Sequence, residues 1–289
     1  FLIILKLVFL FIAIPLLGIG QNKIDPFQIY GPYGSETFSN FNQALLNAQN
    51  CYKLKSEGED LSKSAKRIKK LSKLYVIDLN NNNIDSFPES ISTFRNLMYL
   101  KSSGNPLKKL PESIGSTPTI KPIILHHTVL DSLPDSFNKL GSLAELEIQV
   151  NNADTFFTKE AFKGLYNLKS IMLYKSNLKE FPKGLQTNGK LKKIMMIDCH
   201  LTKVDSLFGQ SKSVQTLILD KNQFTVFPQE VFQLATLKEL SLRENKLTSL
   251  PEKVSKIRGL EILDLTGNKI PLVEIDVLRS LLPGCKIIY

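Results

Sequence analysis

The sequence predicts an α/β solenoid shaped like a horseshoe, with one parallel sheet on its concave face and short helical or 3-10 segments on its convex face. Three observations predict this fold. A frame of spaced aliphatic residues recurs along most of the 289-residue chain, usually at intervals of 23 residues. A small polar residue recurs at one fixed position of that frame. In six copies a hydrophobic residue and a proline follow at a fixed distance.

The frame reads L-x-x-L-x-L-x-x-N-x-L, where L is an aliphatic residue. The copy beginning at Leu74 fits it completely, with Asn82 at the ninth position. Successive copies are 23 residues apart, except for a step of 25 between Leu143 and Leu168. A degenerate copy precedes them, so ten coils are predicted, beginning at Cys51, Leu74, Leu97, Ile120, Leu143, Leu168, Leu191, Val214, Leu237 and Leu260.

A single coil of this kind cannot fold alone. Ordering ~23 residues costs about 1–2 kcal/mol each, more than the burial of six or seven apolar side chains returns. The coils must therefore stack and share a core. The alternation in x-L-x-L-x predicts a strand, with positions 4 and 6 facing inward and positions 3, 5 and 7 facing outward.

The ninth position requires a buried polar group that ties the turn after each strand to the neighbouring backbone. Asparagine suits this role because it has one acceptor and two donors on a short stem. It occurs at Asn82, Asn105, Asn151, Asn222, Asn245 and Asn268. The position is taken by Thr128, Ser176 and Cys199 in the remaining full copies, and we expect those coils to be tied less tightly.

Prolines predict where each outer segment begins. Motifs such as Phe87-Pro88-Glu89 follow the strand turn, and proline can begin a helical turn without leaving an unsatisfied N–H group. We expect a short helical or 3-10 turn at each of these places. The longer coil has room for a fuller helix between Phe156 and Leu165.

Taken together, these motifs resemble the leucine-rich repeat family over roughly residues 51–289. Within it, the consensus is similar to the type found in many bacterial proteins and in Ras-group scaffolds of plants and animals. The resemblance implies a leucine-rich repeat solenoid that binds a protein ligand, with adhesion or recognition as the broad role. Cysteine-clustered caps, usual in extracellular animal and plant members, do not occur in this sequence.

The two ends differ from the repeats. Residues 1–20 are apolar apart from Lys6 and predict a signal peptide, with a retained N-terminal anchor as the alternative. Residues 21–50 predict an extended segment followed by a capping helix over Ser35–Asn50, begun by Ser35 or Thr37. After the array of residues 51–270, residues 271–289 predict a second cap, with an apolar helix face and a last strand at Cys285–Tyr289. The expected apolar face consists of Val273, Val277 and Leu281.

The three cysteines lie at least four coils apart, at Cys51, Cys199 and Cys285. At about 4.8 Å per coil their separation exceeds roughly 19 Å, far beyond the reach of a disulfide. We therefore expect free thiols. The chain also has no Asn-x-Ser/Thr sequon, and both features favour a bacterial exported protein, secreted or bound to the cell envelope.

Outward strand positions predict the binding surface. The middle coils place apolar residues there, and we expect them to form an exposed patch that includes His126 and has Tyr99 at its edge. Such a patch is typical of a protein-binding site, although neutral drift, or cover by the N-terminal segment or a second subunit, would also explain it. The candidate residues are Tyr99, Ile124, His126, Met172, Tyr174, Met195, Ile197 and Ile218.

The net charge of +10 raises the question of an anionic partner. The concave positions sum to about −1, which argues against nucleic acid, so the positive charge lies on the convex side, the loops and the ends. One dense cluster is a candidate for anionic lipid or polysaccharide. It consists of Lys66, Arg67, Lys69, Lys70 and Lys73.

Signals for catalysis are weak. His126 and His200 lie about three coils apart, roughly 14 Å, which is too far to share a metal ion. The sequence has no phosphate loop, no nucleophile elbow and no metal-spaced set of Cys and His. We therefore expect no enzymatic activity and no cofactor or metal. The prediction is an exported protein that binds a protein partner, with an intracellular scaffold or an envelope-associated binder of anionic glycan or lipid as the alternatives.

Overall fold

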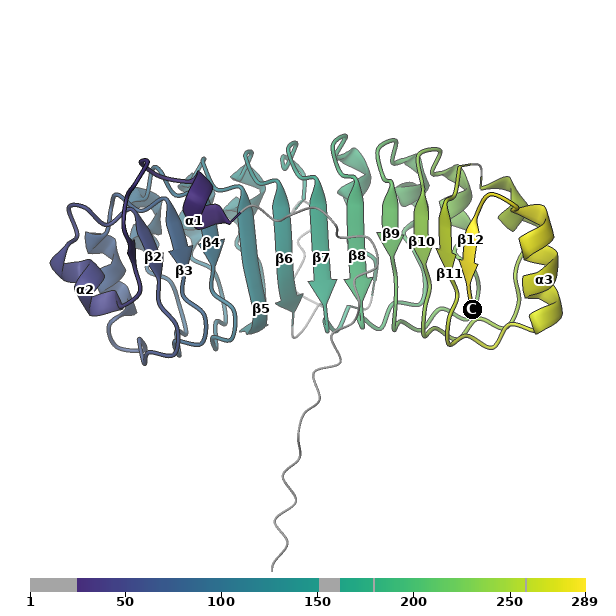
Figure 1. Ribbon diagram of the computed structural model, residues 1–289, viewed down its shortest axis with the longest axis horizontal. Helices are drawn as coiled ribbons and strands as arrows, with labels where there is room; N and C mark the ends of the chain where they lie inside the picture. Colours follow the sequence, from purple (N-terminus) through teal and green to yellow (C-terminus); the bar gives the residue numbers. More distant parts are fainter. Residues whose placement is uncertain (1–24, 151–161, 179, 258) are drawn as a thin grey trace, which may run out of the picture.

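The computed structural model describes residues 25–150, 162–178, 180–257 and 259–289. Within them the chain forms one curved sheet of twelve parallel strands, arranged in chain order from β1 to β12 (Figure 1). The strands are β1 Thr37–Phe38, β2 Lys53–Lys55, β3 Val76–Asp78, β4 Tyr99–Lys101, β5 Pro122–Leu130, β6 Glu145–Val150, β7 Ser170–Tyr174, β8 Lys193–Ile197, β9 Thr216–Ile218, β10 Glu239–Ser241, β11 Ile262–Asp264 and β12 Lys286–Ile288. Strands β2 to β11 come one from each predicted coil, so the solenoid prediction is confirmed.

The aliphatic positions of the frame form a continuous core. In β4, for example, Leu100 is fully buried between Tyr99 and Lys101, which are half-exposed. The same alternation is present in β7, β9 and β11, because each strand has one face on the core and one on the concave surface. The register from coil to coil is therefore fixed, with Leu100 directly opposite Ile77 and Ile123.

The ninth-position side chains form the expected hydrogen-bonded ladder. Asn105 donates from Nδ2 to the Leu79 carbonyl at 2.7 Å, and its Oδ1 accepts from the backbone N–H groups of Asn82 and Ile84 at 2.9 and 3.0 Å. Thr128 makes only long contacts of 3.5 and 3.4 Å to the carbonyls of Leu125 and Gln149. The hydrogen bonds of Thr128 to the neighbouring backbone are therefore weaker than those of Asn105, as expected. Asn151 lies outside the described residues.

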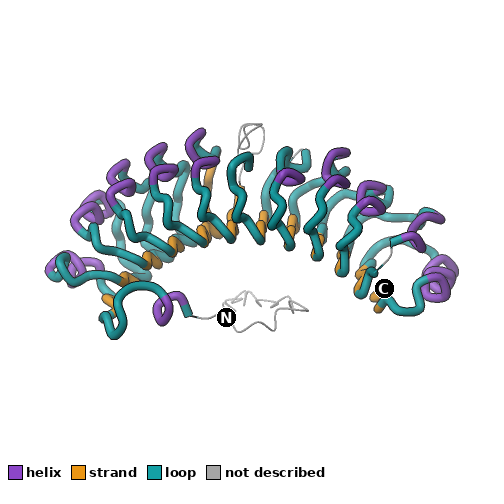
Figure 2. The backbone as a smooth tube through the Cα atoms, turned by 90° about the horizontal axis from the view of Figure 1, so that it is seen from above, coloured by secondary structure: helices purple, strands orange, loops and turns teal. Residues whose placement is uncertain are grey.

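Short 3-10 helices follow the prolines on the convex side (Figure 2). Five of them begin directly after a proline of the motif, at Pro88, Pro111, Pro134, Pro228 and Pro251. The expected helix between Phe156 and Leu165 falls mostly outside the described residues. The described 3-10 helices are η1 Ala65–Lys70, η2 Glu89–Thr93, η3 Glu112–Ser116, η4 Asp135–Lys139, η5 Leu185–Thr187, η6 Ser206–Gln210, η7 Gln229–Gln233 and η8 Glu252–Lys256.

The N-terminal end differs from the expected extended segment and long helix. A one-turn helix, α1, spans Pro26–Ile29, and the capping helix α2 is limited to Phe41–Leu46. Phe38 belongs instead to β1, which pairs with β2. The cap is Asn40, whose Oδ1 accepts from the N–H of Gln43 at 3.0 Å, so Ser35 and Thr37 were wrong. The predicted signal peptide, residues 1–20, lies outside the described residues.

The C-terminal cap was predicted with the wrong buried face. Helix α3 spans Leu272–Leu281 after Pro271, but Ile275 and Leu278 are its buried residues. Val273 and Val277 are 68% and 53% exposed. Both sets have helical spacing, so periodicity alone could not choose between them. The strand predicted over Cys285–Tyr289 is present as β12, beside β11. No helix within the described ranges is long and apolar enough to cross a membrane.

Candidate functional site

The strand register brings most of the predicted binding residues together on the concave face. Met195 of β8 lies directly between Met172 of β7 and Ile218 of β9, and Tyr174 lies opposite Ile197. We call these five residues the central apolar surface. They are neighbours because each occupies position 5 or 7 of its coil and adjacent strands are only about 4.8 Å apart.

Solvent exposure within this surface is uneven. Met172, Tyr174, Ile197 and Ile218 are half-buried, as a contact surface requires. Met195 is only 2% exposed and Ile124 only 9%, so the expectation that these two side chains face water was wrong. Neither belongs to the interior core cluster, because both are at outward strand positions. Met195 is covered because it has a large apolar neighbour on each adjacent strand. Ile124 lies instead near the N-terminal segment of the chain.

The N-terminal segment, Asp25–Ser35, lies on the concave side of the first strands. Figure 2 shows α1 inside the curve, on the opposite side of the sheet from the 3-10 helices. The Lys121 ammonium lies 5.6 Å from the centre of the Tyr30 ring, and Lys55 lies 5.8 Å from that of Phe27. Lys53 donates to the Ser35 carbonyl at 3.4 Å. Cover by the N-terminal segment was one alternative explanation of the apolar patch. It applies to the end of the patch that lies on β4 and β5.

A cavity of about 680 Å³ separates the N-terminal segment from the strands beneath it. Burial, and after it the charges of Asp78 and Glu147, raise the pKa of Tyr99, so its hydroxyl stays protonated. Nε2 of His126 lies 3.4 Å from a carboxylate oxygen of Glu147. The cavity is lined by Pro26, Ile29, Tyr30, Tyr99, Lys101, Lys121, Pro122, Ile124, His126, Ala144, Glu145, Glu147 and Lys169.

The concave face becomes polar beyond Ile218. The carboxylate of Asp220 accepts hydrogen bonds from the Ser241 hydroxyl and, at 3.2 Å, from the backbone N–H of Arg243. Burial raises the pKa of Asp220 to about 6, and the charge of Asp264 adds to this rise. Asp220 therefore marks the C-terminal boundary of the central apolar surface.

Three lysines beside the central apolar surface were not singled out from the sequence. Lys169 directly precedes β7 and Lys192 directly precedes β8, both at position 2 of their coils, and Lys193 is the first residue of β8 at position 3. We call them the basic rim. Lys169 and Lys192 occupy position 2, which was not among the positions assigned to the concave face, so only Lys193 was counted there.

The predicted basic cluster lies elsewhere. Lys66, Arg67, Lys69 and Lys70 are exposed on η1, in the coil between β2 and β3, and Lys73 is half-buried just after it. This cluster shares no strand with the central apolar surface. It cannot contribute to the same contact.

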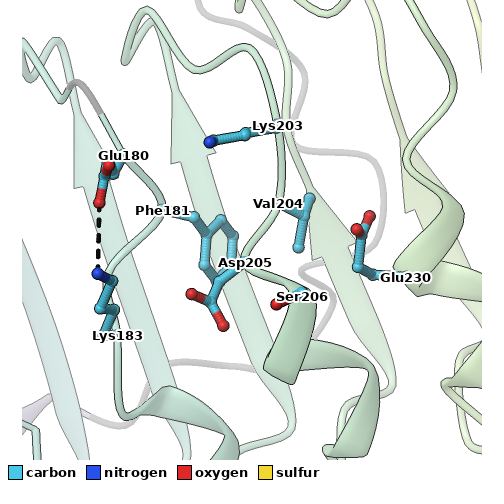
Figure 3. A pocket seen from close by; sticks show the side chains of 8 residues that line it. All are labelled: Glu180, Phe181, Lys183, Lys203, Val204, Asp205, Ser206 and Glu230. Atoms are coloured by element: carbon cyan, nitrogen blue, oxygen red, sulfur yellow. Dashed lines mark ion pairs between the residues drawn. The ribbon is translucent and has the colours of Figure 1, made fainter.

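Pockets between neighbouring coils recur outside the concave face. Figure 3 shows one of them, where Phe181 and Val204 lie between charged side chains and Glu180 pairs with Lys183 at 3.6 Å. A second pocket places Leu110 and Leu133 in the same way. All four apolar residues occupy position 14 of their coils, so these pockets follow from coil stacking. The described residues contain no group of three or more His, Cys, Asp or Glu able to hold a metal ion.

Comparison with known proteins agrees with the repeat geometry. A leucine rich repeat model matches residues 212–270, and a second one matches residues 73–94. No curated protein has significant similarity to the sequence.

Several solved structures share the fold. An internalin, InlF of Listeria monocytogenes, aligns with a TM-score of 0.69 at 18% identity, over 89% of this chain and 72% of that one. The plant peptide hormone receptor RGFR1, solved in complex with RGF2, aligns with a TM-score of 0.57 at 22% identity, over 78% of this chain and 42% of the receptor. The ectodomain of the Arabidopsis thaliana receptor kinase GASSHO1/SCHENGEN3, in complex with CASPARIAN STRIP INTEGRITY FACTOR 2, gives a TM-score of 0.59 at 22% identity, covering 81% and 28%. The chain thus spans less than half the length of either plant receptor.

The matched repeat models, the ladder of ninth-position side chains and the single parallel sheet lead to one conclusion. The chain has the fold of a leucine-rich repeat solenoid, and its residues 73–94 and 212–270 match leucine rich repeat models.

Proposed function

We propose that this protein is exported, has no enzymatic activity, and binds a protein partner on its concave face in adhesion or recognition. The observation that carries the proposal is the central apolar surface. Its half-buried Met, Ile and Tyr side chains form one contiguous group in register on adjacent strands.

The physical argument is the cost of leaving these side chains in water. Apolar surface yields roughly 25 cal/mol per Å² when it is buried, and contiguous apolar groups with polar neighbours mark many contact sites. Methionine and aromatic residues are also enriched in the buried centres of protein interfaces. Two structurally similar plant proteins were solved with ligands named as RGF2 and CASPARIAN STRIP INTEGRITY FACTOR 2, and this supports a binding role for the fold.

The test is a paired substitution, Met172→Glu with Ile218→Glu. Met195 is left unchanged because a charge at a 2% exposed position would also destabilise the fold. Proteins captured from the native environment by the wild-type chain should be lost by the double variant, while its melting temperature changes little. The matched control is Leu207→Glu with Val226→Glu, two exposed apolar residues off the central surface, 50% and 67% exposed.

Retention of the same partners by the concave variant would contradict the proposal. Loss of the same partners by the control variant would show that any apolar-to-acid change disturbs binding. Only loss confined to the concave variant supports the assignment.

The export component is tested separately. Sequencing the N-terminus of the chain recovered from its native cells should show cleavage near Gly20 and recovery outside the cytosol. A cytosolic chain that retains Phe1–Gly20 would favour the intracellular scaffold instead.

A second candidate function, binding to anionic glycan or lipid, is favoured by the exposed basic cluster on η1. Its binding should weaken steeply as salt rises, because exposed charges are screened over about 10 Å at 0.1 M salt. Neutralising Lys66, Lys69 and Lys70 to Gln should abolish retention on a heparin column or on anionic vesicles if this function is real. Unchanged retention would exclude it.

A further inference from the structure

We propose that the partner's contact surface is acidic as well as apolar, with its carboxylates placed against the basic rim of Lys169, Lys192 and Lys193. This inference rests on the proposed function and defines the chemistry of the partner at the same surface.

The basic rim and the central apolar surface belong to one continuous area. The N–H groups of Lys192 and Lys193 donate to the carbonyl of Lys169 at 2.9 and 3.1 Å, so the three lysines occupy adjacent strand ends. Lys193 and Met195 are two residues apart on β8, and residues two apart on a strand share a face. A partner seated on Met172 and Met195 therefore lies beside these ammonium groups.

Several lysines on or beside the concave face have an acidic partner, whereas the lysines of the rim have none among the ion pairs of the described residues. Lys101 pairs with Asp78 at 3.8 Å, Lys221 with Glu244 at 3.5 Å and Lys238 with Glu261 at 2.7 Å. Within the described residues, no ion pair joins any lysine of the rim to a carboxylate. A partner's carboxylates can therefore pair with ammonium groups of the rim that no ion pair of the described residues already holds.

The composition of the strand ends strengthens this contrast. Positions 2 and 3 of the coils that carry β7, β8 and β9 hold three lysines and no carboxylate, the others being Ser170, Gln215 and Thr216. Glu145, at the start of β6, adds to the effect of burial in raising the pKa of Tyr30, and it lines the same cavity as Lys169, with no ion pair between the two within the described residues. A further positive charge lies at the C-terminal end of β7, where the Lys175 ammonium is 5.3 Å from the centre of the Tyr174 ring.

The charge requirement follows from desolvation. An apolar partner that covers the central surface also removes water from the neighbouring ammonium groups, and an ion that loses water without gaining a counter-charge weakens binding. A partner carboxylate at the same place offsets this cost, speeds association and disfavours neutral or basic competitors. The adjacent strands predict partner carboxylates about 5 Å apart.

The shape of the site favours a polypeptide over a membrane. The surface lines the inside of a curved sheet, and the N-terminal segment stands over its first strands (Figure 2). A flat bilayer cannot follow this inner curve, whereas a polypeptide segment can enter it. The ammonium group of Lys121 lies over the Tyr30 ring of the N-terminal segment. The part of the concave face that this segment leaves uncovered therefore begins on the C-terminal side of Lys121.

The test is a selection of random 12-residue peptides displayed on phage against the immobilised full chain. The peptides enriched should combine Asp or Glu with large apolar residues. Their affinity for Lys169→Glu/Lys192→Glu/Lys193→Glu should fall at least about tenfold relative to wild type, since each exposed pair contributes up to about 1 kcal/mol. The triple arginine variant should keep binding, because it conserves charge.

Two controls make the outcome specific. Reversing Lys66, Lys69 and Lys70 to Glu changes the net charge equally on another face and should leave peptide affinity within about twofold. Vesicles containing 30% phosphatidylglycerol, as a membrane probe, should not bind through the rim.

The outcomes separate the two proposals. Peptides that lose binding to Met172→Glu/Ile218→Glu but not to the rim variant would overturn the acidic-partner inference and keep the proposed function. Peptides insensitive to both variants, or a selection with no enriched binder, would count against both. Enrichment of neutral or basic peptides, or rim-dependent capture of the vesicles in place of peptides, would also overturn the inference.

Discussion

At the scale of single residues, the ninth-position side chains explain how neighbouring coils are joined. Asn222 donates to the carbonyls of Met196, at 2.7 Å, and Leu219, at 2.9 Å, and accepts from the N–H groups of Cys199 and Leu201, both at 3.0 Å. One side chain thus satisfies backbone groups of two coils in the water-free interior. Unsatisfied groups of this kind cost about 1–3 kcal/mol each.

We therefore predict that Asn222→Ala destabilises the protein by about 3 kcal/mol or more, seen as a lower midpoint in urea unfolding. The matched control is Asn177→Ala, at an exposed position just after the ladder residue of its own coil, which should change stability by less than about 0.5 kcal/mol. Equal effects of the two substitutions would show that the ladder does not hold the coils.

A second residue-scale prediction concerns the pH dependence of stability. Because the pKa of Asp220 is raised to about 6, the folded chain binds a proton that the unfolded chain, with a pKa near 3.9, releases. Stability from this group is therefore greatest below about pH 4, falls as pH rises to about 6, and is constant above. Asp220→Asn keeps a hydrogen-bond acceptor, so it should remove this fall and stabilise the protein at pH 7 by roughly 2 kcal/mol.

Urea unfolding of both proteins at pH 4, 5, 6 and 7 measures this difference directly. A constant difference between them across the range would contradict the assigned pKa.

At the scale of elements, the caps show how tertiary contacts choose between equally good local patterns. Helix α3 has apolar residues on two faces, and of these Ile275 and Leu278 are the buried ones. At the other end, Phe38 could continue a helix by its spacing, yet it extends the sheet as β1. In both caps the choice depends on what the adjacent coil leaves uncovered, which lies far away in the sequence.

The element-scale prediction compares the two faces of α3. Leu278→Ala should lower stability by about 2–4 kcal/mol because it leaves a cavity against the last coil. Val277→Ala, on the exposed face, should change stability by less than about 0.5 kcal/mol. Thermal unfolding followed by circular dichroism measures both, and a larger loss for Val277→Ala would mean that the helix packs with its other face.

At the scale of the whole molecule, stacking determines which groups water reaches. Cys51 and Cys199 are fully buried in distant coils, and burial raises the pKa of each thiol to about 12. Cys285, at the C-terminal cap, is only half-buried, although burial raises its pKa also. Thiols react as thiolates. Burial therefore protects Cys51 and Cys199 in two ways, because it keeps reagents away from the sulfur and because the raised pKa lowers the thiolate fraction.

We predict that a thiol reagent at pH 8 labels one cysteine quickly in the native protein, and that this is Cys285. The other two should react only at the rate of unfolding, and all three should react in 6 M guanidinium. Cys285→Ser should remove the fast reaction. Rapid labelling of Cys199 in the native chain would mean that the array opens at its centre.

Much of this protein was determined by the sequence itself: the frame places Leu100 inside and Met172 outside, and the ladder residues and prolines locate the turns. Those features are local and repeated, so the same inward positions, outward positions and turns can be assigned in every coil. The tertiary structure alone decided that α1 lies across the first strands, that Ile275 and not Val277 caps the array, and that Met195 is nearly covered. Each depends on a neighbour supplied by another part of the chain, and one-dimensional spacing contains no information about such neighbours.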